Sequence, residues 1–126
     1  MNPVVYDSAA LIAADRNDRR VWAEHRVRLE SGSVPLVPAA VVAQASRSPK
    51  QVQLRRFLAG CQVVAFDETA AYRTGALLGR AKTHDVIDAA VVELAVRHGA
   101  DVVTQDVDDI AALTRAMKAR LRVMRP

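Results

Sequence analysis

Short apolar runs alternate along the chain with segments in which apolar residues recur at helical spacing. The runs are rich in β-branched residues and predict strands over residues 4–6, 34–37, 63–66, 101–104 and 121–124. The segments between them predict helices over residues 8–14, 18–29, 38–45, 50–58, 67–79, 85–98 and 107–117. This alternation predicts a single α/β domain, residues 1–126, with a mostly parallel sheet of four to five strands and helices on both faces.

Capping residues define several of these boundaries. Pro38 suits the first turn of a helix, because an amide hydrogen is not needed there. Thr83 is predicted to cap the helix that begins at residue 85, and Gly99 to end that helix as a left-handed residue. Most of the few aromatic residues lie in apolar runs and are expected in the core; the five are Tyr6, Trp22, Phe57, Phe66 and Tyr72.

The composition narrows the class of protein. Hydrophobic residues make up 51% and charged residues 25% of the chain, which indicates a globular rather than a disordered protein. The single cysteine, Cys61, excludes an internal disulfide and a multi-cysteine zinc site. The N-terminus does not resemble a secretory signal, and the least polar stretch, residues 33–45, is shorter than the roughly 20 residues of a membrane span. We therefore expect a cytoplasmic protein without a membrane-spanning helix.

The charges are unevenly distributed. The net charge is +4, yet residues 85–109 hold seven acids and one base, Arg97. By contrast, residues 47–56 hold four bases and no acid: Arg47, Lys50, Arg55 and Arg56. The basic stretch is equally consistent with a surface that binds phosphates and with an ordinary solvated helix face. The acidic segment needs an explanation of its own.

Several of these acids are predicted to meet at one edge of the sheet. Asp7 follows the first strand directly, Asp106 follows the fourth strand, and Asp88 lies in the first turn of a helix. Asp109 follows Asp106 by one helical turn, so the two can share a face. Converging carboxylates repel each other unless a cation neutralises them, and a set of oxygen ligands favours Mg²⁺ or Mn²⁺. Ordinary helix caps explain each acid equally well, so from the residues alone both interpretations stay open.

Three segments together resemble a PIN domain of the kind found in the VapC-like toxins of bacterial toxin–antitoxin pairs. They are Val4-Val5-Tyr6-Asp7-Ser8, Asp88 to Ala95 with its Gly99 stop, and Val102 to Ile110. The match spans essentially the whole chain. It implies a three-layer α/β/α sandwich and a Mg²⁺- or Mn²⁺-dependent endoribonuclease. It also implies a homodimer and an antitoxin that inhibits the enzyme.

The resemblance assigns roles by position. It places catalytic, metal-binding acids at Asp7, Asp88 and Asp106, and a further metal-binding acid at Asp109. Where the family has a glutamate on the helix after the second strand, this chain has Gln44, which removes one negative charge. Ser8 and Thr104 are candidates to orient the carboxylates. The basic stretch at residues 47–56 is the candidate RNA-binding surface.

Two functions remain open at this point. The first is a ribonuclease toxin, favoured by the four retained aspartates. The second is a catalytically impaired PIN-like module that binds RNA or a protein partner without cleavage, favoured by Gln44. A phosphoacceptor receiver domain is disfavoured, because Asp7 is followed by Ser8 and residues 83–117 contain no lysine. Histidine spacing does not suggest a metal site, and Cys61 is expected to be buried packing.

Overall fold

The computed structural model describes residues 1–126 as an alternation of five strands and seven helices. The strands are β1 (Val4–Tyr6), β2 (Leu36–Pro38), β3 (Gln62–Val64), β4 (Asp101–Val103) and β5 (Val123–Met124). The helices are α1 (Ser8–Asp15), α2 (Arg19–Glu30), α3 (Ala39–Ala45), α4 (Val52–Ala59), α5 (Glu68–Ala81), α6 (Val86–His98) and α7 (Val107–Ala116). Each predicted strand and helix is present, with shifts of a few residues at the ends.

All five strands are parallel, in the order β3-β2-β1-β4-β5. The chain first adds β2 and β3 on one side of β1, then crosses over and adds β4 and β5 on the other side. The register pairs Tyr6 with Val103, so the carboxyl ends of β1 and β4 lie level. The order reverses at β1, and the carboxyl ends of the strands at such a switch point are where open α/β sheets bind ligands.

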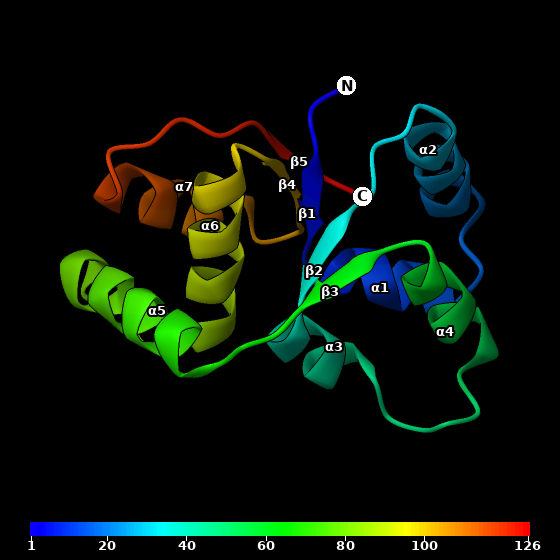
Figure 1. Cartoon of the computed structure of the whole chain (residues 1–126), viewed down its shortest axis with the longest axis horizontal. Coiled ribbons are helices and arrows are strands. Elements are labelled where there is room, and N and C mark those ends of the chain that lie inside the picture. Colours follow the sequence, from blue (N-terminus) through cyan, green and yellow to red (C-terminus); the bar gives the residue numbers. More distant parts are fainter.

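Helices cover both faces of the sheet, which makes the three layers of an α/β/α sandwich. Figure 1 shows α5, α6 and α7 on one side of the strands, with α1, α2 and α4 on the other and α3 near the carboxyl ends. The sheet and its covering helices bury one continuous core, in which β1, β4 and most of α6 are buried. A strand that is covered on both faces is apolar throughout, as the Val-rich runs predict. No helix is long and apolar enough to cross a membrane.

Some predicted boundaries and burials are wrong for identifiable reasons. Pro38 does not begin a helix: it ends β2 in an extended conformation, and α3 starts at Ala39. Helix α5 does not fray at Gly79, because Leu77, Leu78 and Ala81 still pack on the core. The helix ends instead at Lys82, which adopts a left-handed conformation.

Further differences concern α6 and the aromatic residues. Asp85 rather than Thr83 caps α6, because its carboxylate accepts the amide hydrogen of Asp88. The predicted third strand ends at Val64, which leaves Phe66 on an exposed loop. Tyr72 is 74% exposed on the outer face of α5. The aromatic core is therefore made by Tyr6, Trp22 and Phe57 together with His25.

Candidate active site

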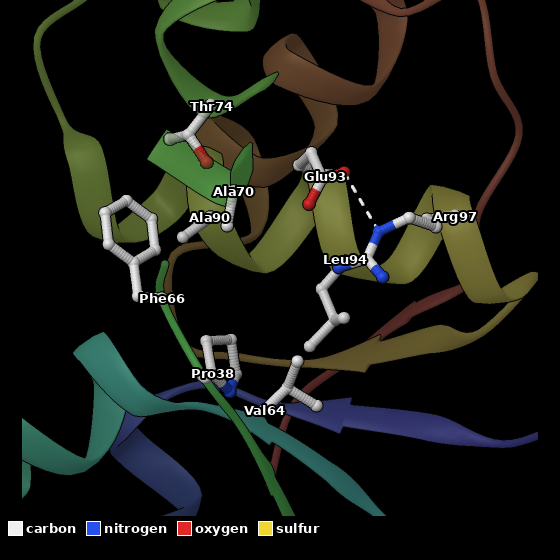
Figure 2. Close-up of a pocket in the computed structure, with 10 residues that line it drawn as sticks. Pro38, Val64, Phe66, Ala70, Thr74, Ala90, Glu93, Leu94 and Arg97 are labelled. Atoms are coloured by element: carbon white, nitrogen blue, oxygen red, sulfur yellow. Dashed lines mark hydrogen bonds and ion pairs between the residues drawn. The ribbon is translucent and has the colours of Figure 1, made fainter. Parts of the chain in front are cut away.

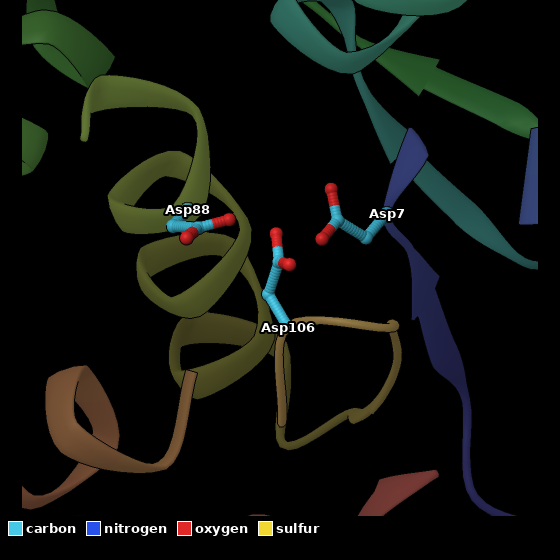
Figure 3. Close-up of side chains that lie close together, drawn as sticks. All are labelled: Asp7, Asp88 and Asp106. Atoms are coloured by element: carbon cyan, nitrogen blue, oxygen red, sulfur yellow. The ribbon is translucent and has the colours of Figure 1, made fainter. Parts of the chain in front are cut away.

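Three aspartates meet at the carboxyl edge of the sheet. Each of Asp7, Asp88 and Asp106 offers a carboxylate oxygen, and these oxygens lie within 4.8 Å of one another. Figure 3 shows the side chains converging from the end of β1, the first turn of α6 and the loop after β4. Asp7 and Asp88 are buried, whereas Asp106 is exposed. The cluster is therefore open to solvent on the side of Asp106.

Asp7 is held in one orientation by two hydrogen bonds. The Ser8 amide donates to its Oδ1 at 2.7 Å, and the Thr104 hydroxyl donates to its Oδ2 at 2.6 Å. The first bond caps α1, so capping and membership of the cluster occur together in this residue. Ser8 acts through its backbone; its side chain makes no hydrogen bond within the chain.

Thr104 links two of the three aspartates. While its hydroxyl donates to Asp7, its oxygen accepts the backbone amide of Asp106 at 2.9 Å. Thr104 is itself fully buried at the end of β4. A single hydroxyl therefore fixes both the Asp7 carboxylate and the backbone that carries Asp106. An outer group of this kind orients the ligands in metal sites.

The strand that carries Asp7 is anchored by the residue before it. The Tyr6 hydroxyl is hydrogen-bonded to Nδ1 of the buried His25 at 2.9 Å, and the Arg28 guanidinium donates to the same hydroxyl at 3.2 Å. The Tyr6 ring also stacks on Phe57, with 5.2 Å between the ring centroids. These contacts tie the end of β1 to α2 and α4, so the backbone at Asp7 has little freedom to move.

Of the three aspartates, Asp88 has the least favourable electrostatic environment. It is 3% exposed, and its Oδ2 is buried without any hydrogen-bond partner. The burial of an unpaired carboxylate oxygen is costly, since nothing replaces the water that it loses. Asp85, which caps α6 at the Asp88 amide, adds a further carboxylate nearby. Asp85 is not among the predicted site residues, although an aspartate at the start of a predicted helix is a typical N-cap signal.

The electrostatic consequence is a raised pKa at two of the acids. Burial raises the pKa of Asp88 to about 7, and repulsion from Asp85, Asp7, Asp106 and Asp109 adds to the effect. The pKa of Asp106 is raised in the same direction, first by desolvation and then by Asp7, Asp109 and Asp85. The site as a whole therefore has a surplus of negative charge.

This arrangement fits a divalent cation. Hard cations such as Mg²⁺ or Mn²⁺ are bound by carboxylate oxygens. Here three carboxylates each offer an oxygen within 4.8 Å of the others, one of the three also has a buried oxygen without a partner, and the cluster is open to solvent. No basic side chain forms an ion pair with Asp7, Asp88 or Asp106. The repulsion among the acids is therefore not compensated by the chain itself.

The other predicted residues lie at different distances from this centre. Asp109 is outside the group of three and borders a cavity of about 270 Å³ together with Asp85 and Asp88. Gln44 is exposed on α3, which follows β2 at the same edge of the sheet, and its side chain makes no hydrogen bond within the chain. The four bases of residues 47–56 are all exposed. The guanidinium of Arg47 donates to the carbonyl oxygens of Ala43 and Ser46.

A second buried acid lies on α6, away from the cluster. Glu93 is 6% exposed and pairs with Arg97 at 3.1 Å and with Arg73 at 3.8 Å. Figure 2 shows it beside a small pocket between α5, α6 and the ends of β2 and β3, with Thr74 facing the same space. This pocket shares no residue with the cavity that Asp88 borders.

Cys61 is a poor candidate for a nucleophile, because burial raises the pKa of its thiol to about 12.

Comparison with solved structures identifies chains of similar fold. One is from VapBC2 of Rickettsia felis bound to a DNA fragment from its promoter, with a TM-score of 0.73, 14% identity and 98% of each chain covered. Another is from FitAcB of Neisseria gonorrhoeae, with a TM-score of 0.63, 17% identity and 96% of each chain covered. A third is from a toxin–antitoxin complex of Klebsiella pneumoniae, with a TM-score of 0.63, 19% identity and coverage of 86% of this chain and 90% of that one. At these identities the likeness shows the fold alone.

Family membership is decided by sequence. No curated protein matches the chain. The family model of the PIN domain matches residues 4–115, a span that contains all three clustered aspartates. The chain therefore belongs to the PIN domain family.

Proposed function

We propose that the protein is a Mg²⁺- or Mn²⁺-dependent endoribonuclease that acts as the toxin of a toxin–antitoxin pair. The observation that carries the proposal is the buried, partnerless Oδ2 of Asp88 in a cluster with Asp7 and Asp106. PIN domains are generally nucleases, and similar folds occur in solved toxin–antitoxin complexes. These findings support a hydrolytic role for the aspartates of this chain.

In this mechanism, Asp7, Asp88 and Asp106 would hold the cation. The Thr104 hydroxyl and the Ser8 amide fix the orientation of the Asp7 carboxylate, and a cation bound there would offset the charge of the buried Asp88 carboxylate. The bound cation supplies stabilisation of the negative charge that develops on the phosphate during attack by water. Asp106, on the open side, lies where the phosphodiester enters. Asp109 contributes negative charge at the margin of the site and supports the binding of the cation.

The binding of RNA is assigned to exposed basic side chains. Arg47, Lys50, Arg55 and Arg56 lie on α4 and the segment before it, on the side of the sheet that carries α1. Gln51 orders this segment: its side-chain oxygen accepts the amides of Arg47 and Ser48, and its amide donates to Asp15. Contacts between basic side chains and phosphates are independent of the RNA sequence, and they weaken steeply as the salt concentration rises. The proposed surface therefore contributes affinity more than specificity.

The proposed partners follow from the similarity of fold to solved structures. Of the solved structures of similar fold, the one from Klebsiella pneumoniae is a toxin–antitoxin complex, and the one from Rickettsia felis is VapBC2 bound to a DNA fragment from its promoter. We infer an antitoxin for this chain as well, a homodimer as the active form and the cytoplasm as the compartment. The exposed Asp106 side of the cluster gives an inhibitory partner access to the acids.

A cleavage assay with matched variants tests the proposal. Purified protein is incubated with a structured RNA in Mn²⁺, in Mg²⁺ and in EDTA, beside Asp88→Asn and Asp7→Asn. Asp108→Asn is the control, because Asp108 is an exposed acid on α7 that lies outside the cluster. We expect cleavage that needs the metal, that is lost by at least about a hundredfold in both site variants and that is unchanged in the control.

Two outcomes would contradict the proposal in different ways. Equal cleavage by the site variants would show that the aspartates do not carry the reaction. Binding of RNA without cleavage in any metal would favour the second function, a PIN-like module that only binds. The observation that favours this second function is Gln44, which leaves α3 without the carboxylate that the family places there.

A further inference from the structure

A groove extends from the acidic cluster to the turn between α5 and α6. It consists of two adjoining depressions that share Thr83. The first, of about 270 Å³, is bordered by Asp85, Asp88 and Asp109. The second, of about 540 Å³, is bordered by Lys82 and His84. The groove is therefore acidic at the end next to the candidate active site, and its only lysine and only histidine lie at the other end.

The two polar side chains at the far end are free to take a ligand. Lys82 and His84 are both exposed, and neither side chain makes a hydrogen bond or an ion pair within the chain. The backbone beneath them is fixed, because the amides of Lys82 and Thr83 both donate to the Leu78 carbonyl. A lysine ammonium and an imidazole N–H are suitable donors for a phosphate oxygen.

The floor of this second depression suits the rest of a nucleotide. It is formed by Leu78, Gly79 and Val86, and Val86 is 44% exposed. A side chain at Gly79 would meet no atom within 4 Å, so the floor is open at that point. An open apolar surface beside two donors can contact the base or the ribose of a nucleotide while its phosphate contacts the donors.

We propose that the depression at Lys82 and His84 binds a nucleotide next to the scissile one in a single strand of RNA, through its phosphate. The inference rests on the proposed function, since it places the scissile phosphate at Asp7, Asp88 and Asp106. The acids next to the cleavage point repel an incoming polyanion. The Lys82 ammonium in the neighbouring depression offsets this repulsion and holds the strand across the acids.

A matched pair of lysines makes the test sharp. Lys82 and Lys118 each follow the last turn of a helix, each is exposed, and each has a positive φ, of 56° and 52° respectively. Only Lys82 borders the groove. Asparagine tolerates a left-handed backbone, so Lys82→Asn and Lys118→Asn each remove one charge at the end of a helix with little strain.

The measurement is the binding of a short, fluorescein-labelled, single-stranded oligoribonucleotide, followed by fluorescence anisotropy in EDTA over a series of salt concentrations. We expect Lys82→Asn to weaken binding roughly threefold to tenfold and to lower the slope of log affinity against log salt by about 0.7, the loss of one phosphate contact. Lys118→Asn is expected to bind like the parent. Thermal unfolding of both variants checks that the fold is retained.

Equal binding by Lys82→Asn and Lys118→Asn would overturn the inference, as would a parent protein that does not bind the oligoribonucleotide. The nuclease proposal is tested separately by adding Mn²⁺ to the same samples. If the parent binds but does not cleave, the proposed function fails while the comparison of the two lysine variants still decides whether the depression binds RNA. If the parent cleaves and Lys82→Asn matches it in affinity and salt slope, only this inference fails.

Discussion

Helix α6 carries two buried acids whose electrostatic surroundings are opposite. Glu93 lies between Arg97 and Arg73, so its charge has partners supplied by the chain. Asp88, one and a half turns earlier, is surrounded by Asp85, Asp7, Asp106 and Asp109, and one of its oxygens has no partner at all. The two residues lie on different faces of the same helix and are buried to a similar degree.

The contrast separates a structural acid from a functional one. Glu93 shows that arginines can reach a buried carboxylate on this helix. The accumulation of further acids around Asp88 is therefore not forced by the fold. Uncompensated charge of this kind is destabilising by itself and is typical of sites where a ligand completes the structure.

The largest effect is expected in the pH dependence of stability. The folded protein keeps the Asp88 proton up to a pKa of about 7, whereas an unfolded chain releases it near 3.8. At this residue folding therefore binds a proton in this interval, and the contribution of Asp88 to the stability of the metal-free protein falls as pH rises from about 4 to about 7. Asp88→Asn cannot ionise, so at pH 8 it is expected to be about 2–4 kcal/mol more stable than the parent in chemical denaturation.

The same experiment with metal sharpens the contrast. Mn²⁺ is expected to raise the thermal midpoint of the parent at pH 8 and to leave that of Asp88→Asn nearly unchanged, because a ligand stabilises only the state that binds it. A difference in stability between the parent and Asp88→Asn that does not change between pH 4 and 8 would show that the charge of Asp88 is compensated in a way that the structure does not contain.

A smaller effect is expected when the support of the acidic cluster is removed. Thr104→Val deletes the hydroxyl that donates to Asp7 and accepts from the Asp106 amide, at similar side-chain volume. We expect affinity for Mn²⁺ to fall by about tenfold to a hundredfold in calorimetric titration, as for other residues that orient metal ligands. Thr114→Val is the control, because Thr114 is also a buried threonine whose hydroxyl bonds a backbone oxygen away from the site. Unchanged affinity in Thr104→Val would show that Asp7 needs no such support.

The smallest effect is expected at the compensated acid. Glu93→Gln removes the charge between Arg97 and Arg73, whose side chains are 37% and 43% exposed and can be solvated instead. Stability is expected to fall by about 1 kcal/mol, with no change in affinity for Mn²⁺. Glu24→Gln, in the exposed pair with Arg20, is the control and should change stability very little. A loss of metal affinity in Glu93→Gln would mean that the two faces of α6 are coupled.

The fold was predictable from the sequence because its signals are local. Val-rich runs mark strands that are buried on both sides, and Gly99 ends α6 in the left-handed conformation that was predicted. The errors occur where tertiary packing decides. Gly79 looked like a helix end, yet α5 continues because Leu78 and Ala81 contact the core. Phe66 looked like a core residue, yet β3 ends two residues earlier.

The site was predictable only in part. Open parallel sheets bind ligands at the carboxyl ends of their strands, and this rule was enough to predict that Asp7, Asp88 and Asp106 lie close together. It could not distinguish Asp109, in the first turn of α7, from the three that meet, because the position of Asp109 depends on the angle at which α7 leaves the sheet. Nor could it show the partnerless oxygen of Asp88 or the bridging role of Thr104, which are matters of side-chain orientation.

The bond from the Thr104 hydroxyl to Asp7 joins positions that are 97 residues apart in the sequence. During translation, Asp7 is synthesised before Thr104 and Asp106. A chain released before β4 lacks two of the groups that complete the cluster, however well its earlier part folds. The cluster of Asp7, Asp88 and Asp106 therefore cannot assemble before β4 and the loop after it have been synthesised.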